Sequence, residues 1–314
     1  MNPLSTIYGA AVQARNGLYN HGILKARTLR GPVVSVGNIS VGGSGKTPFV
    51  ILLGGLLQAR GIPFDVLSRG YGRKTRGILE VDPKGSPRDF GDEPILIAKR
   101  LGCPVIVGEN RYQAGLFAEN KFGPQLHILD DGFQHRSLAR DFDIVLLTSE
   151  DARDQLLPAG RLREPRSSLR RADAVVVTVE SPYPELKGDG PCLWHLRRNI
   201  SITEVPPRPV VFCGIARPQS FVDQLQAAAV NPVATKFYRD HHSYTERDIY
   251  DLTTLREQNR AGGFVTTEKD AINLGPLLTS LNPVAIARAV MELLSPAEAL
   301  DTILRVIREP RPQP

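Results

Sequence analysis

Residues 33–47 read Val-Val-Ser-Val-Gly-Asn-Ile-Ser-Val-Gly-Gly-Ser-Gly-Lys-Thr, an apolar strand that runs directly into a glycine-rich turn. Glycines let successive backbone N–H groups converge on phosphate oxygens, and the lysine and threonine supply a cation and a ligand for Mg²⁺. The stretch therefore predicts a phosphate-binding loop in a protein that uses a nucleoside triphosphate. The expected nucleotide contacts are Ser40, Val41, Gly42, Gly43, Ser44, Gly45, Lys46 and Thr47, and Thr47 is also an expected metal ligand.

The loop departs from the general phosphate-loop pattern at one position. That pattern has a glycine five residues before Gly45, where this chain has Ser40, while Gly42 and Gly43 lie inside the loop. An ordinary glycine-rich turn between a strand and a helix is the alternative interpretation. Gly-Lys-Thr directly after an apolar strand favours phosphate binding over that alternative.

Composition limits the possible partners. The chain has 314 residues and a formal net charge of +6, which suits nucleic acid, an anionic membrane or a phosphorylated substrate equally well. The basic residues are not interleaved with aromatic ones, so we expect no nucleic-acid partner. Cys103, Cys192 and Cys213 lie far apart without a C-x-x-C pair, which indicates a reducing compartment and no structural zinc.

Short β-rich runs alternate with helical stretches through the first two thirds of the chain. This alternation predicts an α/β fold of the P-loop NTPase type, a mostly parallel sheet with helices on both faces. The expected strands are Pro32–Val36, Phe64–Leu67, Ile78–Val81, Pro104–Val107, Leu126–Leu129, Asp143–Leu147 and Ala174–Val179.

A proline-rich stretch at Ile202–Pro209 interrupts this pattern, because clustered prolines end helices and central strands. We place a domain boundary or hinge there. The prediction is a phosphate-loop domain over residues 1–205 and a second, smaller α/β domain over residues 206–295. The last helix, residues 296–308, can pack on either domain.

The segment Leu4–Leu24 has the apolar spacing of an amphipathic helix, and Lys25, Arg27 and Arg30 follow it. Such a helix can lie in a membrane interface, or it can dock on the protein's own core. No apolar run approaches the roughly 18 residues of a spanning helix, and the N-terminus lacks the pattern of a secretory signal. We therefore expect a cytoplasmic protein.

A second nucleotide motif is expected at His127–Asp131, an apolar strand that ends in Asp130 and Asp131. A carboxylate at such a strand end can hold Mg²⁺ opposite the phosphates. Strands often end in aspartate for turn geometry alone, but the upstream phosphate loop favours the metal role.

Further motifs follow one another along the chain. They are Val36–Pro48, Ser68–Gly72, Gly91–Pro94, Asp130–His135, Leu157–Pro165, Asp240–His241 and Thr266–Ala271. Together they resemble the tetraacyldisaccharide 4′-kinase family, the lipid A 4′-kinases of Gram-negative bacteria, over nearly the whole chain. Members of that family have a hydroxyl residue at the position of Ser40, so the loop departs from the general pattern and not from the family.

The resemblance implies an ATP- and Mg²⁺-dependent kinase that phosphorylates the 4′-hydroxyl of a tetraacylated glucosamine disaccharide 1-phosphate, a lipid A precursor. It implies a peripheral protein at the cytoplasmic face of the bacterial inner membrane. Two alternatives are a soluble small-molecule kinase with the same loop and a nucleotide-dependent switch GTPase. The amphipathic N-terminus opposes the first, and the absence of an Asn-Lys-x-Asp motif from the sequence opposes the second.

The resemblance also implies the catalytic groups. Asp92 serves as base together with a histidine of the second domain, for which His241 is favoured over His242 because it directly follows Asp240. From the residues alone, Asp92 could instead cap the helix that starts near Pro94.

By the same resemblance, Asp130 and Asp131 are metal and catalytic carboxylates whose division of roles stays open. Arg163 stabilises the charge of the transferred phosphoryl group, and Glu164 assists the metal. The expected substrate contacts are Arg69, Tyr71 and Arg73. The stretch Glu268–Asp270 has no assigned role, and a structural one is as plausible as a functional one.

Overall fold

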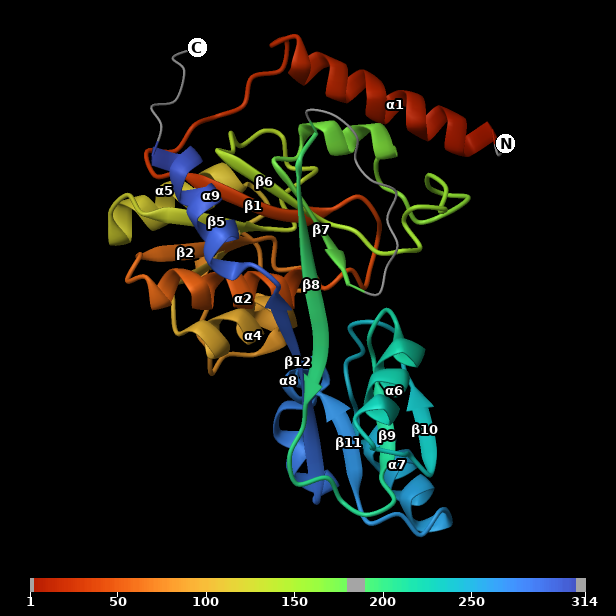
Figure 1. Cartoon of the computed structure of the whole chain (residues 1–314). Coiled ribbons are helices and arrows are strands. Elements are labelled where there is room, and N and C mark those ends of the chain that lie inside the picture. The colour runs from red at the N-terminus through yellow and green to blue at the C-terminus, as the bar shows by residue number, and fades with distance from the viewer. Residues whose placement is uncertain (1–2, 180–189, 309–314) are drawn as a thin grey trace.

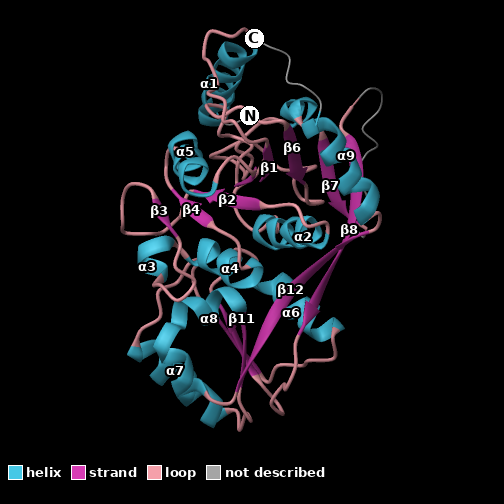
Figure 2. Cartoon of the chain, turned by 90° about the vertical axis from the view of Figure 1, so that its left-hand side faces the viewer, coloured by secondary structure: helices cyan, strands magenta, loops and turns pink. Residues whose placement is uncertain are grey.

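The computed structural model describes residues 3–179 and 190–308, which form a larger and a smaller lobe joined by two long strands (Figure 1). These strands are β8 (Cys192–Ser201) and β12 (Val284–Leu293), and they pair antiparallel with each other. The turned view of Figure 2 shows both strands descending from the larger lobe into the smaller one. In the described residues one sheet runs through both lobes, in the order β10-β9-β11-β12-β8-β7-β6-β1-β5-β2-β4-β3.

The larger lobe contains the parallel sheet that the sequence predicts. β1 lies between β5 and β6, and the pairings from β7 to β4 are all parallel; the short β3 adds an antiparallel edge. Its strands are β1 (Val33–Asn38), β2 (Phe64–Ser68), β3 (Leu79–Glu80), β4 (Val105–Val107), β5 (Leu126–Asp130), β6 (Phe142–Leu146) and β7 (Ala174–Thr178). Its helices are α1 (Pro3–Asn20), α2 (Lys46–Ala59), α3 (Pro87–Phe90), α4 (Asp92–Leu101), α5 (Arg111–Phe122), η1 (Arg166–Arg171) and α9 (Pro296–Arg308).

Successive residues of a strand point to opposite faces of the sheet, and the strands have apolar residues on both faces. Helices therefore cover both faces. Val34 and Val36 of β1 pack in a core with residues of α2, α4 and α9, whereas Val33 packs in another with residues of α5. β1 is buried along its whole length, including its polar residues Ser35 and Asn38. The predicted α/β fold with helices on both faces is confirmed.

The smaller lobe is a second α/β unit with its own apolar clusters. Parallel strands β10, β9, β11 and the first part of β12 form its sheet. Its elements are β9 (Val210–Cys213), α6 (Pro218–Ala227), β10 (Ala234–Phe237), α7 (Glu246–Gln258), β11 (Phe264–Thr267), α8 (Glu268–Leu274) and η2 (Gly275–Leu281). Residues of β9, β11 and α6 form one cluster, and residues of α7 and η2 help form the other.

The chain passes between the lobes along β8, before the proline-rich stretch. The first half of β8 pairs with β7, and its second half, from Leu196 to Ser201, pairs with β12. Ile202–Pro209 therefore follows the crossing and leads into β9, at the end of the smaller lobe far from the larger one (Figure 1). Sequence reasoning missed β8, because its alternating polar residues resemble a solvated segment.

The last helix returns to the larger lobe. Ala299, Leu300, Ile303 and Leu304 of α9 are buried and join the core that contains Val36. Figure 1 shows α9 lying against the upper lobe after β12 brings the chain back. Of the two placements left open for this helix, the structure has the one on the phosphate-loop lobe.

The N-terminal helix lies on the outside of the larger lobe (Figure 1). Its apolar side chains do not enter a core: Leu4 is 62% exposed and Ile7 is 67% exposed, and Gly9 is the one buried residue of the described helix. Ile23, beyond its end, is 68% exposed. The amphipathic helix predicted from the sequence is present, but it does not dock through its apolar side.

The packing of α9 is testable by truncating one buried side chain. Ile303→Ala should lower the free energy of unfolding by about 2–5 kcal/mol, because it leaves a cavity in the core of the larger lobe. Denaturant unfolding followed by circular dichroism measures this change.

The matched control is Arg305→Ala on the exposed side of the same helix, which should change stability by less than about 0.5 kcal/mol. Equal effects of the two substitutions would contradict the packing of α9 on the core.

Candidate active site

A cavity of about 700 Å³ lies between the two lobes and is lined by residues of both. The larger lobe contributes the glycine-rich loop and the ends of β2 and β5. The smaller lobe contributes the loops that follow β9 and β10 and the junction of β11 with α8. The predicted residues on the wall are Val41, Gly42, Gly43, Ser44, Gly45, Lys46, Thr47, Arg69, Tyr71, Asp130, Asp131, Arg163 and His241.

The glycine-rich loop connects β1 to α2, as the sequence predicts. Gly45 caps α2 with φ 86°, a left-handed conformation that glycine adopts without strain. Asn38, at the end of β1, donates from Nδ2 to Ser44 Oγ over 2.8 Å, and its Oδ1 accepts from Lys46 Nζ over 3.4 Å. The loop backbone and the start of α2 thus present N–H groups and a lysine to the cavity, the arrangement that binds phosphate.

Asp130 lies at the end of β5, level with Val36 of β1. Ser68 donates to Asp130 Oδ2 over 2.9 Å, whereas Oδ1 is buried with no hydrogen-bond partner among the described residues. Burial, with the charges of Glu93 and Asp131, raises the pKa of Asp130 to about 7. A buried carboxylate oxygen without a partner fits the second motif's expected role beside a cation.

Asp131, the next residue, faces two cations. Arg163 donates to both of its oxygens, over 2.7 and 3.0 Å, and Lys46 Nζ lies 3.5 Å from Oδ1. Burial opposes ionisation, but Lys46 and Arg163 outweigh it and hold the pKa of Asp131 well below its usual range. Arg163 also donates to Asn38 Oδ1, so one guanidinium joins the phosphate loop to the second motif.

Across the cavity, His241 of the smaller lobe meets Asp92 of the larger one. His241 Nδ1 lies 2.9 and 3.0 Å from the two oxygens of Asp92, which is 3% exposed at the start of α4. His241 has φ 58°, a strained conformation typical of functional sites, and its ring lies 5.0 Å from that of Tyr71. His241 lines the cavity, and Asp92 lies behind it.

The contact between His241 and Asp92 stabilises the charged form of each side chain. Burial disfavours the charged imidazole, but the hydrogen bond and charge of Asp92 outweigh it and raise the pKa of His241. Burial likewise opposes ionisation of Asp92, yet His241 and Lys269 lower its pKa overall. Asn273 donates to Asp92 Oδ2 over 2.9 Å and so helps to hold the carboxylate.

The structure separates the two adjacent histidines. His242 Nε2 lies 3.2 Å from Asp248 Oδ2, at the capping box that begins α7, and its ring stacks on Tyr238 at 4.5 Å. His241, and not His242, therefore contacts Asp92, as the order of the motif favours.

Besides Asp92, two more of the predicted site residues lie behind the cavity wall. Ser40 is fully buried and lies 3.5 Å from Asn38 Nδ2, so it supports the loop from below. The Arg73 side chain is 2% exposed, donates to Gly77 O over 2.6 Å and lies 3.8 Å from Glu109. Neither residue is among the described residues that line the cavity.

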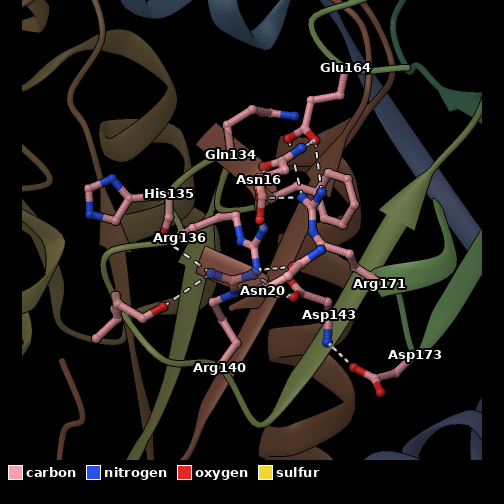
Figure 3. A network of polar contacts seen from close by, with 12 residues as sticks. Asn16, Asn20, Gln134, His135, Arg136, Arg140, Asp143, Glu164, Arg171 and Asp173 are labelled. Carbon is pink, nitrogen blue, oxygen red and sulfur yellow. Dashed lines mark hydrogen bonds and ion pairs between the residues drawn. The ribbon is translucent and has the colours of Figure 1, made fainter. Parts of the chain in front are cut away.

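Glu164 belongs to a different network, which Figure 3 shows. Arg171 donates to both of its oxygens, over 2.7 and 3.2 Å, and Asn16 of α1 donates to Oε2 over 2.9 Å. Its carboxylate is 2% exposed and saturated by these donors. The expected metal role of Glu164 therefore has no support in the geometry; this residue ties α1 to the segment that carries Arg163.

Two cationic residues on the cavity wall, Arg198 and Arg217, were missed by sequence reasoning, and a third, Lys269, was left without an assigned role. Arg198 of β8 donates to Ser44 O, and Arg217, which follows β9, lies over Gly43. Neither belongs to a recognisable motif, so no local signal identifies it. Lys269 contacts Asp240 and His241, and its place in the Thr266–Ala271 motif was the available signal.

Comparisons with known proteins identify the family of this chain. The model of the family described as tetraacyldisaccharide-1-P 4′-kinase matches residues 1–308. A tetraacyldisaccharide 4′-kinase of Koribacter versatilis is 50% identical, with 98% of each chain covered. That of Geobacter metallireducens is 38% identical, with 96% of each chain covered.

A solved structure has the same fold. The crystal structure of the Aquifex aeolicus protein of this family, in complex with ATP, is 35% identical in sequence and superposes with a TM-score of 0.80 over 98% of both chains. The family match, the relatives and the shared architecture lead to one conclusion: this chain belongs to the tetraacyldisaccharide-1-P 4′-kinase family.

Proposed function

We propose that this chain transfers the terminal phosphoryl group of ATP to the 4′-hydroxyl of a tetraacylated glucosamine disaccharide 1-phosphate. The observation that carries the proposal is the Asp92–His241 pair, which opens onto the same cavity as the phosphate loop. A hydroxyl group is a weak nucleophile, and a base placed near bound phosphates is what a kinase adds to a nucleotide site. Family membership favours this activity over a soluble kinase or a switch GTPase.

The phosphate side of the site is built from the glycine-rich loop. Its backbone N–H groups and Lys46 would bind the phosphates, and Arg163 would stabilise charge on the transferred group. Asp130 fits Mg²⁺, because it has a buried oxygen without a partner among the described residues, and Thr47 and Asp131 are the ligands proposed beside it. When bound, Mg²⁺ neutralises phosphate charge.

The acceptor side is formed by His241 and Asp92. Nε2 is the nitrogen of His241 that does not face Asp92, and the imidazole lines the cavity. The proton of the acceptor hydroxyl passes to Nε2 as the new oxygen–phosphorus bond forms and the bond to the departing ADP breaks. Asp92 orients the ring and stabilises the imidazolium that results.

Arg69 and Tyr71 are the proposed contacts of the substrate. Both line the cavity next to His241, and the Tyr71 side chain is 62% exposed. A guanidinium suits a sugar phosphate, and an exposed aromatic ring suits the face of a sugar. Arg73 lies behind this surface and is proposed to support the loop that carries Arg69.

We place the protein at the cytoplasmic face of the inner membrane through α1. No described helix is long and apolar enough to cross a bilayer. The helix docks through polar groups: Tyr8 donates to Arg163 O over 3.0 Å, and Asn16 bonds Glu164 (Figure 3). Leu4 and Ile7 stay exposed, which is the arrangement of a helix that lies in a lipid interface.

The base assignment is testable by substitution. Asp92→Ala and His241→Ala should each lower kcat by about 10²–10⁴-fold, the usual contribution of a positioned base. The KM for ATP should change little, because neither residue belongs to the phosphate loop. Transfer of ³²P from ATP to the purified lipid disaccharide measures both constants.

His242→Ala is the matched control, since this neighbouring histidine contacts Asp248 instead of Asp92, and it should retain most of the activity. A wild-type rate in the His241 or Asp92 variant would remove that residue from the mechanism.

The membrane role of α1 is testable with vesicles. The double substitution Leu4→Glu and Ile7→Glu should weaken binding to vesicles of anionic phospholipid by about tenfold or more, because burying one such side chain is worth about 1.5–3 kcal/mol. Cosedimentation measures the bound fraction.

The control is Tyr250→Glu, which replaces an exposed aromatic residue of α7, 72% exposed in the smaller lobe. It should bind vesicles like the wild type, and equal binding by all three proteins would contradict the membrane role of α1.

A further inference from the structure

Lys269 is the second residue of α8 and reaches across to both sides of the cleft. Its Nζ lies 2.9 Å from Asp240 Oδ1, 3.2 Å from His241 Nε2 and 3.5 Å from Glu93 Oε1. The side chain is 15% exposed, so these contacts form largely out of water. Lys269 therefore contacts Nε2 of His241, whereas Asp92 contacts Nδ1 of the same ring.

We propose that Lys269 is a positioning residue that holds His241 in the tautomer whose Nε2 can accept a proton. The proposal rests on the proposed role of Asp92 and His241 in the kinase reaction. It concerns which nitrogen of the His241 ring carries the proton before the acceptor hydroxyl binds.

The chemistry of the ammonium group fixes the tautomer. An ammonium has donors and no acceptor, so the imidazole nitrogen facing it must carry the lone pair. Nε2 of His241 therefore accepts from Lys269, and the ring proton resides on Nδ1, where it donates to Asp92. Hydrogen bonds on both ring nitrogens select the same form, as they do for histidines oriented by a second partner.

The same contact opposes premature protonation. An imidazolium would present an N–H at Nε2 to the ammonium, which places two donors and two positive charges together. Asp92 raises the pKa of His241, whereas the charge of Lys269 acts in the opposite direction. Lys269 thus counters the tendency of a buried carboxylate to charge its histidine partner.

Asp240 and Glu93 give Lys269 another place to bind. When an acceptor hydroxyl approaches Nε2, the ammonium can stay on these two carboxylates and release the nitrogen. The hydroxyl proton then moves to Nε2, and Asp92 carries the hydrogen bond from the resulting imidazolium. Lys269 thus occupies the hydrogen-bonding site at Nε2 until the acceptor hydroxyl of the substrate replaces it.

The neighbouring motif residues have structural contacts that set Lys269 in place. Asp270 is fully buried and accepts from Gly214 N over 2.8 Å and from Tyr244 Oη over 2.8 Å. Glu268 pairs with Arg100 of α4, over 2.9 and 3.0 Å. The start of α8 is therefore anchored on both sides, with Lys269 between the anchors.

The direct test is nitrogen NMR of the wild-type protein with ¹⁵N-labelled histidine. The His241→Ala spectrum assigns the signals, which should report a protonated Nδ1 and an unprotonated Nε2 near neutral pH. In Lys269→Met the Nε2 signal should move toward the protonated position. A protonated Nε2 in the wild type, or an Nε2 signal in Lys269→Met that is unchanged from the wild type, would overturn the proposal.

Kinetics give a second readout. Lys269→Met should lower kcat by about 10- to 100-fold, the usual cost of removing a group that orients a working histidine, with the KM for ATP unchanged. Lys269→Arg should recover part of the loss, because it restores a donor at Nε2. Lys99→Met, which removes an exposed lysine of α4, is the matched control and should behave as wild type.

Thermal unfolding of each variant shows whether Lys269 is needed for folding alone. If Lys269→Met does not fold, the wild-type spectrum and Lys269→Arg still decide the tautomer. A wild-type kcat in His241→Ala would reject the base role while leaving the NMR result to stand independently. A folded Lys269→Met with wild-type kcat would reject the role of Lys269 alone.

Discussion

The parallel pairing of β1 with β5 is the constraint on which the phosphate side of the site depends. It sets Val36 level with Asp130, so the turns that leave the two strands begin side by side. Gly37 must be a glycine here, because a Cβ at that position would lie 2.6 Å from the Cβ of Phe133 and 2.8 Å from its backbone nitrogen. This close approach brings Lys46 within 3.5 Å of Asp131, although the sequence separates them widely.

The acceptor side depends on a different physical connection. The paired strands β8 and β12 connect the smaller lobe to the larger one. The contact between His241 and Asp92 joins the two lobes at the cavity. A buried carboxylate is costly unless it is paired, and each lobe supplies what the other lacks. The proposed base pair therefore spans the two lobes, whereas the glycine-rich loop belongs to the larger lobe alone.

Helix α1 has a polar face that contacts the larger lobe and an apolar face that is exposed. Its polar side chains bond the segment of Arg163 and Glu164, and its apolar side chains point to solvent. A cation–π contact of Arg171 with Phe133, at 3.9 Å, continues this network toward the second nucleotide motif. Under the proposed function, a lipid substrate near α1 would meet a helix that is hydrogen-bonded to the segment of Arg163 and Glu164.

The sequence by itself determined the phosphate loop, the parallel sheet and the motif residues, because glycine spacing and buried apolar runs are local signals. Only the tertiary structure decided which residues meet. It brings His241, and not His242, into contact with Asp92, pairs Glu164 with Arg171 and packs α9 on the larger lobe. It also revealed Arg198, Arg217 and Lys269 on the cavity wall. Arg198 and Arg217 belong to no motif, and Lys269 belongs to one without an assigned role, so their contacts arise only when folding brings distant charges within a few ångströms of one another.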